Sequence, residues 1–324
     1  MVKIKLMAFL LLTGLLVSSF PMSSFADKKD PVIQKITARI NEIPINRTKI
    51  QVDPITWVLS PKVSTSYKNA LISQNQSLAN GFPTLFKWKG TTLILIGDPL
   101  TWTPPKGTLS ENCKRIYSQI SEMWGKLPNL SGRLLAGTSY CDDHIIVMVR
   151  PNPSNPIPDA DLMAQELGGE VQENARYLNP SIANLDHGQL TIPNWFLQGS
   201  QSAIAYQAYV SERRTLSGAP NKAFITPDCL TIKLEKLEKV IEGIPSNCVY
   251  TKGFVAVQLM IALYGWDATT RWFSGFTDKN DYQSAFKTAY GDSLSSFNKL
   301  ADSYWKSLVN AKYVAKDVEA RLKK

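Results

Sequence analysis

Runs of apolar residues predict a small β-sheet in the first half of the chain. The segment from Thr91 to Ile96 reads Thr-Thr-Leu-Ile-Leu-Ile and ends at Gly97-Asp98-Pro99, a pattern typical of a strand followed by a turn. Leu134-Leu135 and the run from Ile145 to Val149 are two further strand candidates. We therefore expect these segments to pair in one sheet region.

Apolar positions three or four residues apart predict helices before, within and after this region. The expected helices are Ser64 to Asn80 (closed by Gly81), Leu109 to Trp124, Asp159 to Leu178, and one that opens at Ile192. Residues 27–60 mix Pro, Asn and Lys with short apolar runs and are expected to form an extended arm, and the proline-rich run 151–158 a stiff loop. The fold class indicated is α+β, with a small N-terminal sheet region followed by a mostly helical C-terminal half.

The N-terminus has the pattern of a secretory signal. Lys3 and Lys5 precede an apolar run from Leu6 to Val17, and Ser24-Phe25-Ala26 supplies small residues at the two positions that a signal peptidase reads. The apolar run is shorter than the ~20 residues that span a bilayer, which favours a cleaved signal over an anchor. We expect a signal peptide at residues 1–26, no membrane span after its cleavage, and a secreted or extracytoplasmic protein.

The charge is unevenly distributed. The 324 residues include 36 basic and 27 acidic side chains, a formal net charge of +9. Residues 27–70 hold eight basic and four acidic side chains, residues 311–324 hold five and two, and residues 71–310 hold 21 of each. A neutral body argues against nucleic-acid binding, which needs a basic face on the folded domain. The basic ends instead indicate attachment to an anionic surface.

Four cysteines in an exported protein predict disulfide bonds. Three pairings are possible, and the local pairs Cys113–Cys141 and Cys229–Cys248 are favoured. A zinc site is the competing interpretation, but the sequence contains no Cys-x-x-Cys and the spacings are wide.

The predicted helix from Asp159 to Leu178 carries polar residues of chemical interest. Gln165, Glu166 and Gly169 fall on the side opposite its apolar stripe. Gly168 and Gly169 each cost ~1 kcal/mol relative to Ala in a helix interior. Either another segment passes close to them or a former side chain has been lost.

Two sequence motifs occur one after the other in this region. Gln165-Glu-Leu-Gly-Gly-Glu-Val-Gln172 resembles the His-Glu-x-x-His-x-Val-Gln helix of the gluzincin metallopeptidases, of the peptidase MA-like group. Pro193-Asn-Trp-Phe-Leu-Gln-Gly199 resembles the Pro-x-Trp-Leu-x-Glu-Gly element of that family. The similarity spans residues 85–310 and continues through Tyr250-x-x-Gly253-Phe254, Tyr264-Gly265, the segment Ala285 to Phe297, and Trp305. It implies a zincin core of the thermolysin-like kind.

The departures from the family pattern bear on function. Zinc in this family is held by two histidines and a glutamate, but the three ligand positions are occupied here by Gln165, Gly169 and Gln198. Glu166 stands at the position of the general base and is expected to be vestigial. The resemblance therefore implies a pseudoenzyme that has lost zinc. We expect an exported, non-catalytic, peptidase-like protein that binds a peptide, a glycan or an anionic polymer at the cell envelope, or has a structural role there.

An enzymatic alternative remains open. Glu166, Glu170 and Glu173, with Asp186-His187 downstream, offer carboxylates and one imidazole for a rebuilt metal or hydrolase site. The competing interpretation is a solvated acidic helix face.

Other apparent motifs are assigned structural roles. Gly291-Asp-Ser-Leu294 reproduces the string of an esterase family, but it follows a helical segment and no histidine comes after it, so Asp292 or Ser293 is expected to cap a helix. His144 is expected at an edge or cap. The aromatic residues around Trp195 and Trp272 are expected to pack in the core. The predicted organisation is thus a signal at 1–26, a basic arm with one helix at 27–84, the gluzincin-like domain at 85–310 and a basic tail at 311–324.

Overall fold

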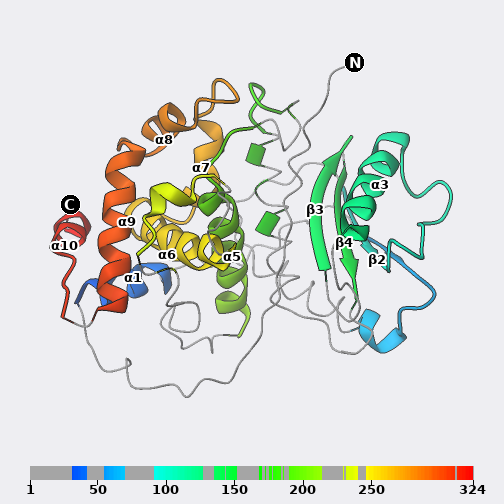
Figure 1. Cartoon of the computed structure of the whole chain (residues 1–324), viewed down its shortest axis with the longest axis horizontal. Helices are drawn as coiled ribbons and strands as arrows, with labels where there is room; N and C mark the ends of the chain where they lie inside the picture. Colours follow the sequence, from blue (N-terminus) through cyan, green and yellow to red (C-terminus); the bar gives the residue numbers. More distant parts are fainter. Residues whose placement is uncertain are drawn as a thin grey trace.

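A sheet with one flanking helix lies beside a larger helical half (Figure 1). The computed structural model describes residues 31–41, 55–69, 91–126, 135–142, 144–151, 168–169, 172, 175–176, 178–183, 185, 190–213, 229, 231–239, 246–310 and 312–323. This arrangement confirms the predicted α+β class. The predicted signal segment 1–26 and the proline-rich run 152–158 lie outside the described residues.

In the described residues four strands form one sheet, in the spatial order β1, β2, β4, β3. Strands β1 (Ile55–Leu59), β2 (Thr91–Ile96) and β4 (His144–Arg150) run parallel, and β3 (Leu135–Cys141) runs antiparallel to β4. The strands expected near residues 91–96, 134–135 and 145–149 are all present. The first strand, β1, was not expected, because it lies inside the predicted arm.

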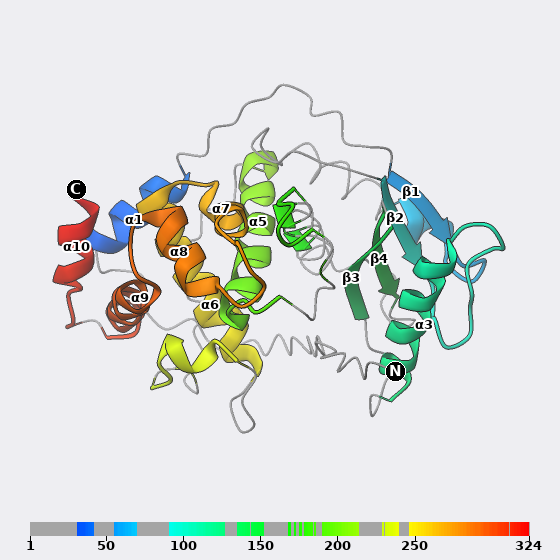
Figure 2. The same cartoon turned by 90° about the horizontal axis from the view of Figure 1, so that it is seen from above.

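Both faces of the sheet are covered, which explains why β2 reads as an unbroken apolar run. Leu93 and Leu95 point to the face on which helix α3 (Glu111–Gly125) packs through Tyr117 and Trp124. Ile94 and Ile96 point to the opposite face, where Tyr67 belongs to the same cluster. Figure 2 shows α3 lying along one side of the strands. The helix expected at 109–124 is thereby confirmed. Of the helix expected at 64–80, residues 64–69 are described, and 65–69 are helical.

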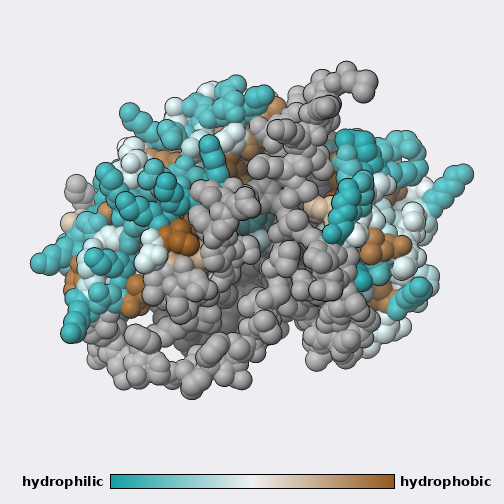
Figure 3. All heavy atoms as spheres, in the orientation of Figure 1, coloured by the Kyte–Doolittle hydropathy of each residue, from teal (hydrophilic) through white to brown (hydrophobic). Residues whose placement is uncertain are grey.

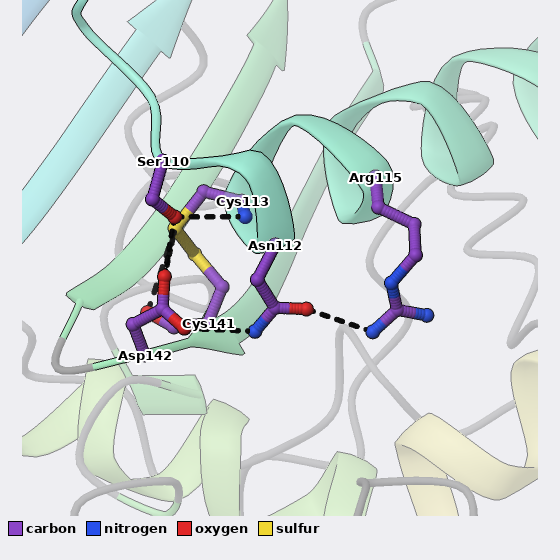
Figure 4. The surroundings of a disulfide bond; sticks show 6 residues. All are labelled: Ser110, Asn112, Cys113, Arg115, Cys141 and Asp142. Carbon is purple, nitrogen blue, oxygen red and sulfur yellow. Dashed lines mark hydrogen bonds between the residues drawn. A yellow bond between two sulfur atoms is a disulfide. The ribbon is translucent and has the colours of Figure 1, made fainter.

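The start of α3 is fixed to the β3–β4 hairpin (Figure 4). The Ser110 hydroxyl accepts a hydrogen bond from the Cys113 amide at 3.1 Å and donates one to the Asp142 carboxylate. Asn112 donates to the other Asp142 oxygen at 3.1 Å. A disulfide joins Cys113 to Cys141, so an N-cap, a turn carboxylate and a covalent bond hold the same corner.

The helical half is built around two long helices, α5 and α6. Its elements are α5 (Asn194–Arg213), the 3₁₀ turn η5 (Leu234–Leu237), α6 (Ser246–Tyr264), α7 (Ala268–Ser274), α8 (Tyr282–Tyr290), α9 (Leu294–Val309) and α10 (Lys316–Leu322). An aromatic cluster holds α5, α7 and α9 together, with Trp195 stacked on Phe297 and Phe196 edge-on to Trp272. The helix expected to open at Ile192 is α5.

The backbones of α5 and α6 cross in direct contact. A Cβ at Gly199 would overlap the Gly253 backbone, and one at Gly253 would overlap the carbonyl group of Trp195. Glycine is therefore required at both positions by space rather than by backbone conformation.

A second disulfide joins Cys229 to Cys248 beside η5 and the start of α6. The two disulfides are the two local pairs that the sequence favours. Because disulfides persist in oxidising compartments, they support an extracytoplasmic setting.

The N-terminal segment corrects one expectation. Residues Pro31–Asn41 form helix α1 rather than part of an extended arm. Val32, Ile36 and Ile40 are at most 1% exposed and belong to the core of the helical half. Their spacing of four residues gives the helix one apolar face, and burial of that face determines the local structure.

The C-terminal segment is likewise part of the fold rather than a free tail. Val318 and Leu322 of α10 are buried in the same core, as is Ala315 before it. Of the basic side chains on these two helices, Lys316 of α10 and Lys323 at its C-cap are exposed, whereas Lys35 and Arg39 of α1 are half-buried.

No single helix in the described part of the chain has the length and hydropathy needed to cross a membrane. The stretch Cys248–Tyr264 of α6 and helix α7 pass the same test only as a pair, bent by 84°. Both belong to the core, to which α6 contributes Val257 and Met260.

We predict that Gly253→Ala lowers the free energy of unfolding by about 1–3 kcal/mol, since the added methyl group meets backbone atoms that cannot move aside. Gly125→Ala in α3 is the matched control. There a Cβ meets only a Leu100 side-chain carbon, at 3.2 Å, and stability should be unchanged or raised. Urea unfolding followed by tryptophan fluorescence measures both. Equal effects of the two substitutions would contradict the close crossing.

A second prediction concerns α1. Ile36→Ala should cost about 2–5 kcal/mol, because the side chain is fully buried. Gln34→Ala, on the exposed side of the same helix, should change stability by less than about 0.5 kcal/mol. The two values come from the same urea titration. An Ile36→Ala variant as stable as the native chain would mean that α1 does not belong to the core.

Candidate functional site

The predicted helix 159–178 meets α5 at the position where the sequence places the candidate site. Five of its described residues are helical, and we call them the site helix: Gly168, Gly169, Gln172, Ala175 and Arg176. Leu178 already lies in a turn, so the helix ends before the predicted residue 178. A Cβ at Gly168 would lie 2.5 Å from the carbonyl oxygen of Gln201. The close passage of another segment, one of the two explanations offered for this glycine pair, therefore holds for Gly168.

Gln172 fastens the site helix to the first turns of α5. Its side chain is 1% exposed, and Nε2 donates to the Leu197 carbonyl oxygen at 3.0 Å and to the Ser200 hydroxyl. That hydroxyl donates in turn to the Phe196 carbonyl oxygen at 2.7 Å. The amide group of Gln172 thus spans the interface between the two helices.

Arg176 fixes the turn that leads from the site helix toward α5. The guanidinium group is buried, and Nη1 donates to the carbonyl oxygens of Ile182 at 3.2 Å and Leu185 at 2.5 Å. Asn179 anchors the same turn to the end of α7 by donating to the Phe273 carbonyl oxygen at 2.8 Å. The segment between the two helices is therefore held from both sides.

Gln198 and Gly169 both lie in the packed interior. Gln198, on α5, is 5% exposed, and no donor among the described residues reaches its Oε1. The same holds for the Oε1 of Gln172. Gly169 is buried and has no side chain. The packing of these helices thus buries two amide oxygens that have no donor among the described residues.

The other residues predicted for this site cannot be placed. Gln165 and Glu166 lie outside the described residues, as do Glu170, Glu173, Asp186 and His187. Neither the vestigial-base assignment nor the rebuilt site is tested by the structure. His144 is the first residue of β4, so it lies at the start of the strand as expected, although β4 is an interior strand and not an edge of the sheet.

The placed residues do not fit a zinc ion. Zinc in proteins takes imidazole, thiolate or carboxylate ligands, whereas Gly169 offers none and Gln198 offers a neutral amide. All four cysteines are in disulfides. In the part of the chain that the structure describes, no three His, Cys, Asp or Glu side chains group closely enough to hold a metal.

A buried ammonium group lies one residue before the α5–α6 crossing. Lys252 is 3% exposed, and its Nζ lies 2.6 Å from Asp302 Oδ1 and donates to the Ile232 carbonyl oxygen. Asp302 also accepts from the Leu234 amide at 3.0 Å, which connects η5 to α9. Burial lowers the pKa of Lys252 from its ordinary value of 10.5, and the contact with Asp302 opposes this. With its partners in place this lysine is a structural group. In the sequence, the burial of Lys252 was indicated by the apolar run that follows it.

The remaining motifs have structural roles. Ser293 caps α9 by accepting from the Ser296 amide at 3.1 Å, and Asp292 accepts from the Tyr264 hydroxyl at 2.6 Å and from Arg321. The esterase-like string is therefore a helix start. The predicted core packing of aromatic residues is confirmed for Trp195, Phe196, Trp266, Trp272, Phe273 and Phe276, whereas the side chains of Tyr206 and Tyr209 lie outside the described set.

No protein-family model, curated protein sequence or solved structure matches this chain.

The buried Lys252 generates a pH prediction. In the folded protein the pKa of Lys252 lies below its ordinary value of 10.5. Between these two pKa values the unfolded chain binds more protons than the folded protein. The contribution of Lys252 to the free energy of unfolding therefore rises with pH in that window. Lys252→Met should remove that rise, while the exposed Lys233→Met should leave it unchanged. Urea unfolding between about pH 7 and 10.5 measures the free energy of unfolding of the native chain and of each variant. Any contribution of the tyrosines to the pH dependence is common to these proteins and cancels when the profiles are subtracted. Parallel pH profiles for Lys252→Met and the native chain would refute the assignment.

Proposed function

We propose that this protein is an exported, non-catalytic relative of the gluzincin peptidases, with a zincin core and a binding role at the cell envelope. The observation that carries the proposal is the pair Gly169 and Gln198. Both are buried next to the contact between the site helix and α5, and together they supply one neutral amide to a site that would need charged or imidazole ligands.

The packing of the site supports retention of the domain without its metal. Gln172, Gly168 and Arg176 hold the site helix and the following turn by hydrogen bonds and backbone contact. None of these contacts requires a metal ion, so the domain can fold with the ligand positions altered. The amide oxygens of Gln172 and Gln198 are both buried, and neither has a hydrogen-bond donor among the described residues.

The proposal predicts that the purified mature chain contains no stoichiometric zinc and has no zinc-dependent proteolytic activity. Elemental analysis and a fluorogenic peptide assay test both points. Stoichiometric zinc would overturn the proposal. Peptidase activity that Glu166→Gln abolishes would establish the alternative hydrolase.

A gain-of-function variant tests the framework itself. Gln165→His, Gly169→His and Gln198→Glu together should create a zinc site, because they restore the ligand set of the family. The matched control replaces Gln198→Glu by Gln201→Glu, one turn further along α5. Equal zinc binding by the two triple variants would count against the assigned positions. If the added histidines prevent folding, the measurement on the native chain still decides the proposal.

A further inference from the structure

The two basic ends of the chain meet in the folded protein. Figures 1 and 2 show α1 beside α10, and both helices bury apolar side chains in the same core. Arg39 of α1 donates to the Ala262 carbonyl oxygen at 2.6 Å and to the Leu322 carbonyl oxygen at 2.9 Å. Helix α1, from the basic segment 27–70, and helix α10, from the basic segment 311–324, therefore form a single region, although about 270 residues separate them.

Helix α9 extends this region. The Ser303 hydroxyl donates to Asp317 at 2.6 Å and lies 3.0 Å from the Tyr313 hydroxyl. Lys306 lies 4.4 Å from the centre of the Tyr313 ring. Hydrophilic side chains cover much of this end of the molecule in Figure 3.

Lysines on α1 and α10 converge around one carboxylate. The pKa of Glu319 is lowered first by its hydrogen bond with Lys323 and also by the nearby charges of Lys35 and Lys316. Lys316 thus lies near Glu319, three residues after Tyr313 in the sequence. We call Lys35, Lys306, Lys312, Lys316 and Lys323 the basic terminal surface.

The acidic residues of this region already have hydrogen-bond or ion-pair partners within the fold. Residues 31–41 and 292–323 contain eight basic and four acidic side chains. The partners of the four acids are Arg321 for Asp292, Lys252 for Asp302, Ser303 for Asp317 and Lys323 for Glu319. Among the described residues, no carboxylate lies within ion-pair distance of Lys306, Lys312 or Lys316, and all three are exposed. Their charge is available to a partner.

We propose that the basic terminal surface binds a flexible linear polymer that carries repeated phosphate groups. The exposed cations are lysines, which act as point charges and need no fixed geometry, whereas Arg39 and Arg321 are directed to partners within the fold. Such a surface suits charges spaced along a mobile chain. This inference rests on the proposed binding role and gives it a class of partner.

A lipid surface fits the region less well. Binding in the membrane interface requires an apolar face beside the charges. In this region, Val314 is the one large apolar side chain that is exposed among the described residues. A single valine does not form such a face.

The test uses the full mature chain and immobilised inorganic polyphosphate. Deleting the C-terminal segment is unsuitable because Val318 and Leu322 are core residues. The variant Lys306→Glu/Lys312→Glu/Lys316→Glu is compared with the control Lys62→Glu/Lys68→Glu/Lys106→Glu. The control has the same net charge, and its three lysines are exposed in the sheet part of the molecule. Affinity is measured from about 50 to 300 mM salt, near and above physiological ionic strength.

The native chain should bind with an affinity that falls as salt rises. The test variant should bind at least about tenfold more weakly. The slope of the logarithm of its binding constant against the logarithm of the salt concentration should fall in magnitude by roughly 2, because each phosphate group that a lysine no longer neutralises reduces that slope by ~0.7. The control should keep the native affinity within about twofold. Equal weakening in both variants, no binding by the native chain, or tighter binding to phosphatidylglycerol vesicles that polyphosphate does not displace would overturn the inference. These results are independent of the zinc measurement, so the failure of one proposal does not imply the failure of the other.

Discussion

The helical half depends on backbone contact between α5 and its two neighbours. At Gly199 and Gly253 the backbones of α5 and α6 approach so closely that neither position has room for a Cβ. Gly168 applies the same constraint from the site helix, against the Gln201 carbonyl group. Because α5 is held on both sides in this way, the residues from Trp195 to Ser200 are all buried. The aromatic contacts with α7 and α9 then follow from where this helix is placed.

Buried and half-buried arginines satisfy the carbonyl groups that this arrangement leaves without partners. The last carbonyl groups of a helix have no donor within it, and a cation near them is favourable. Arg39 donates to Ala262 near the end of α6 and to Leu322 at the end of α10, while Arg176 closes the turn before α5. The guanidinium group suits this use because its donors point in several fixed directions. The arginines discussed here thus serve the fold, whereas Lys306, Lys312, Lys316 and Lys323 of the basic terminal surface are exposed.

Local patterns were sufficient to predict β2, α3 and both disulfides, since each depends on residues near one another in the chain. The missed helix α1 also had a signal, in the spacing of Val32, Ile36 and Ile40, but prolines and polar residues on either side favoured an extended arm. Strand order was not predictable in the same way, because parallel pairing joins segments distant in sequence. The burial of Gln198 and Lys252 depends on which helices pack over them, and composition does not determine that.

The residues that pack the site helix differ from those at the proposed ligand positions. Gly168 and Gln172 contact α5 through backbone approach and hydrogen bonds, and Gly199 contacts α6. Gly169 and Gln198 lie beside them in sequence, and none of these contacts among the described residues involves either one. A metal bound by ligands on both helices would act as a further cross-link, adding stability to a contact that already exists. The function proposed above rests on this separation, in which substitution at the ligand positions removes the metal chemistry without removing the packing.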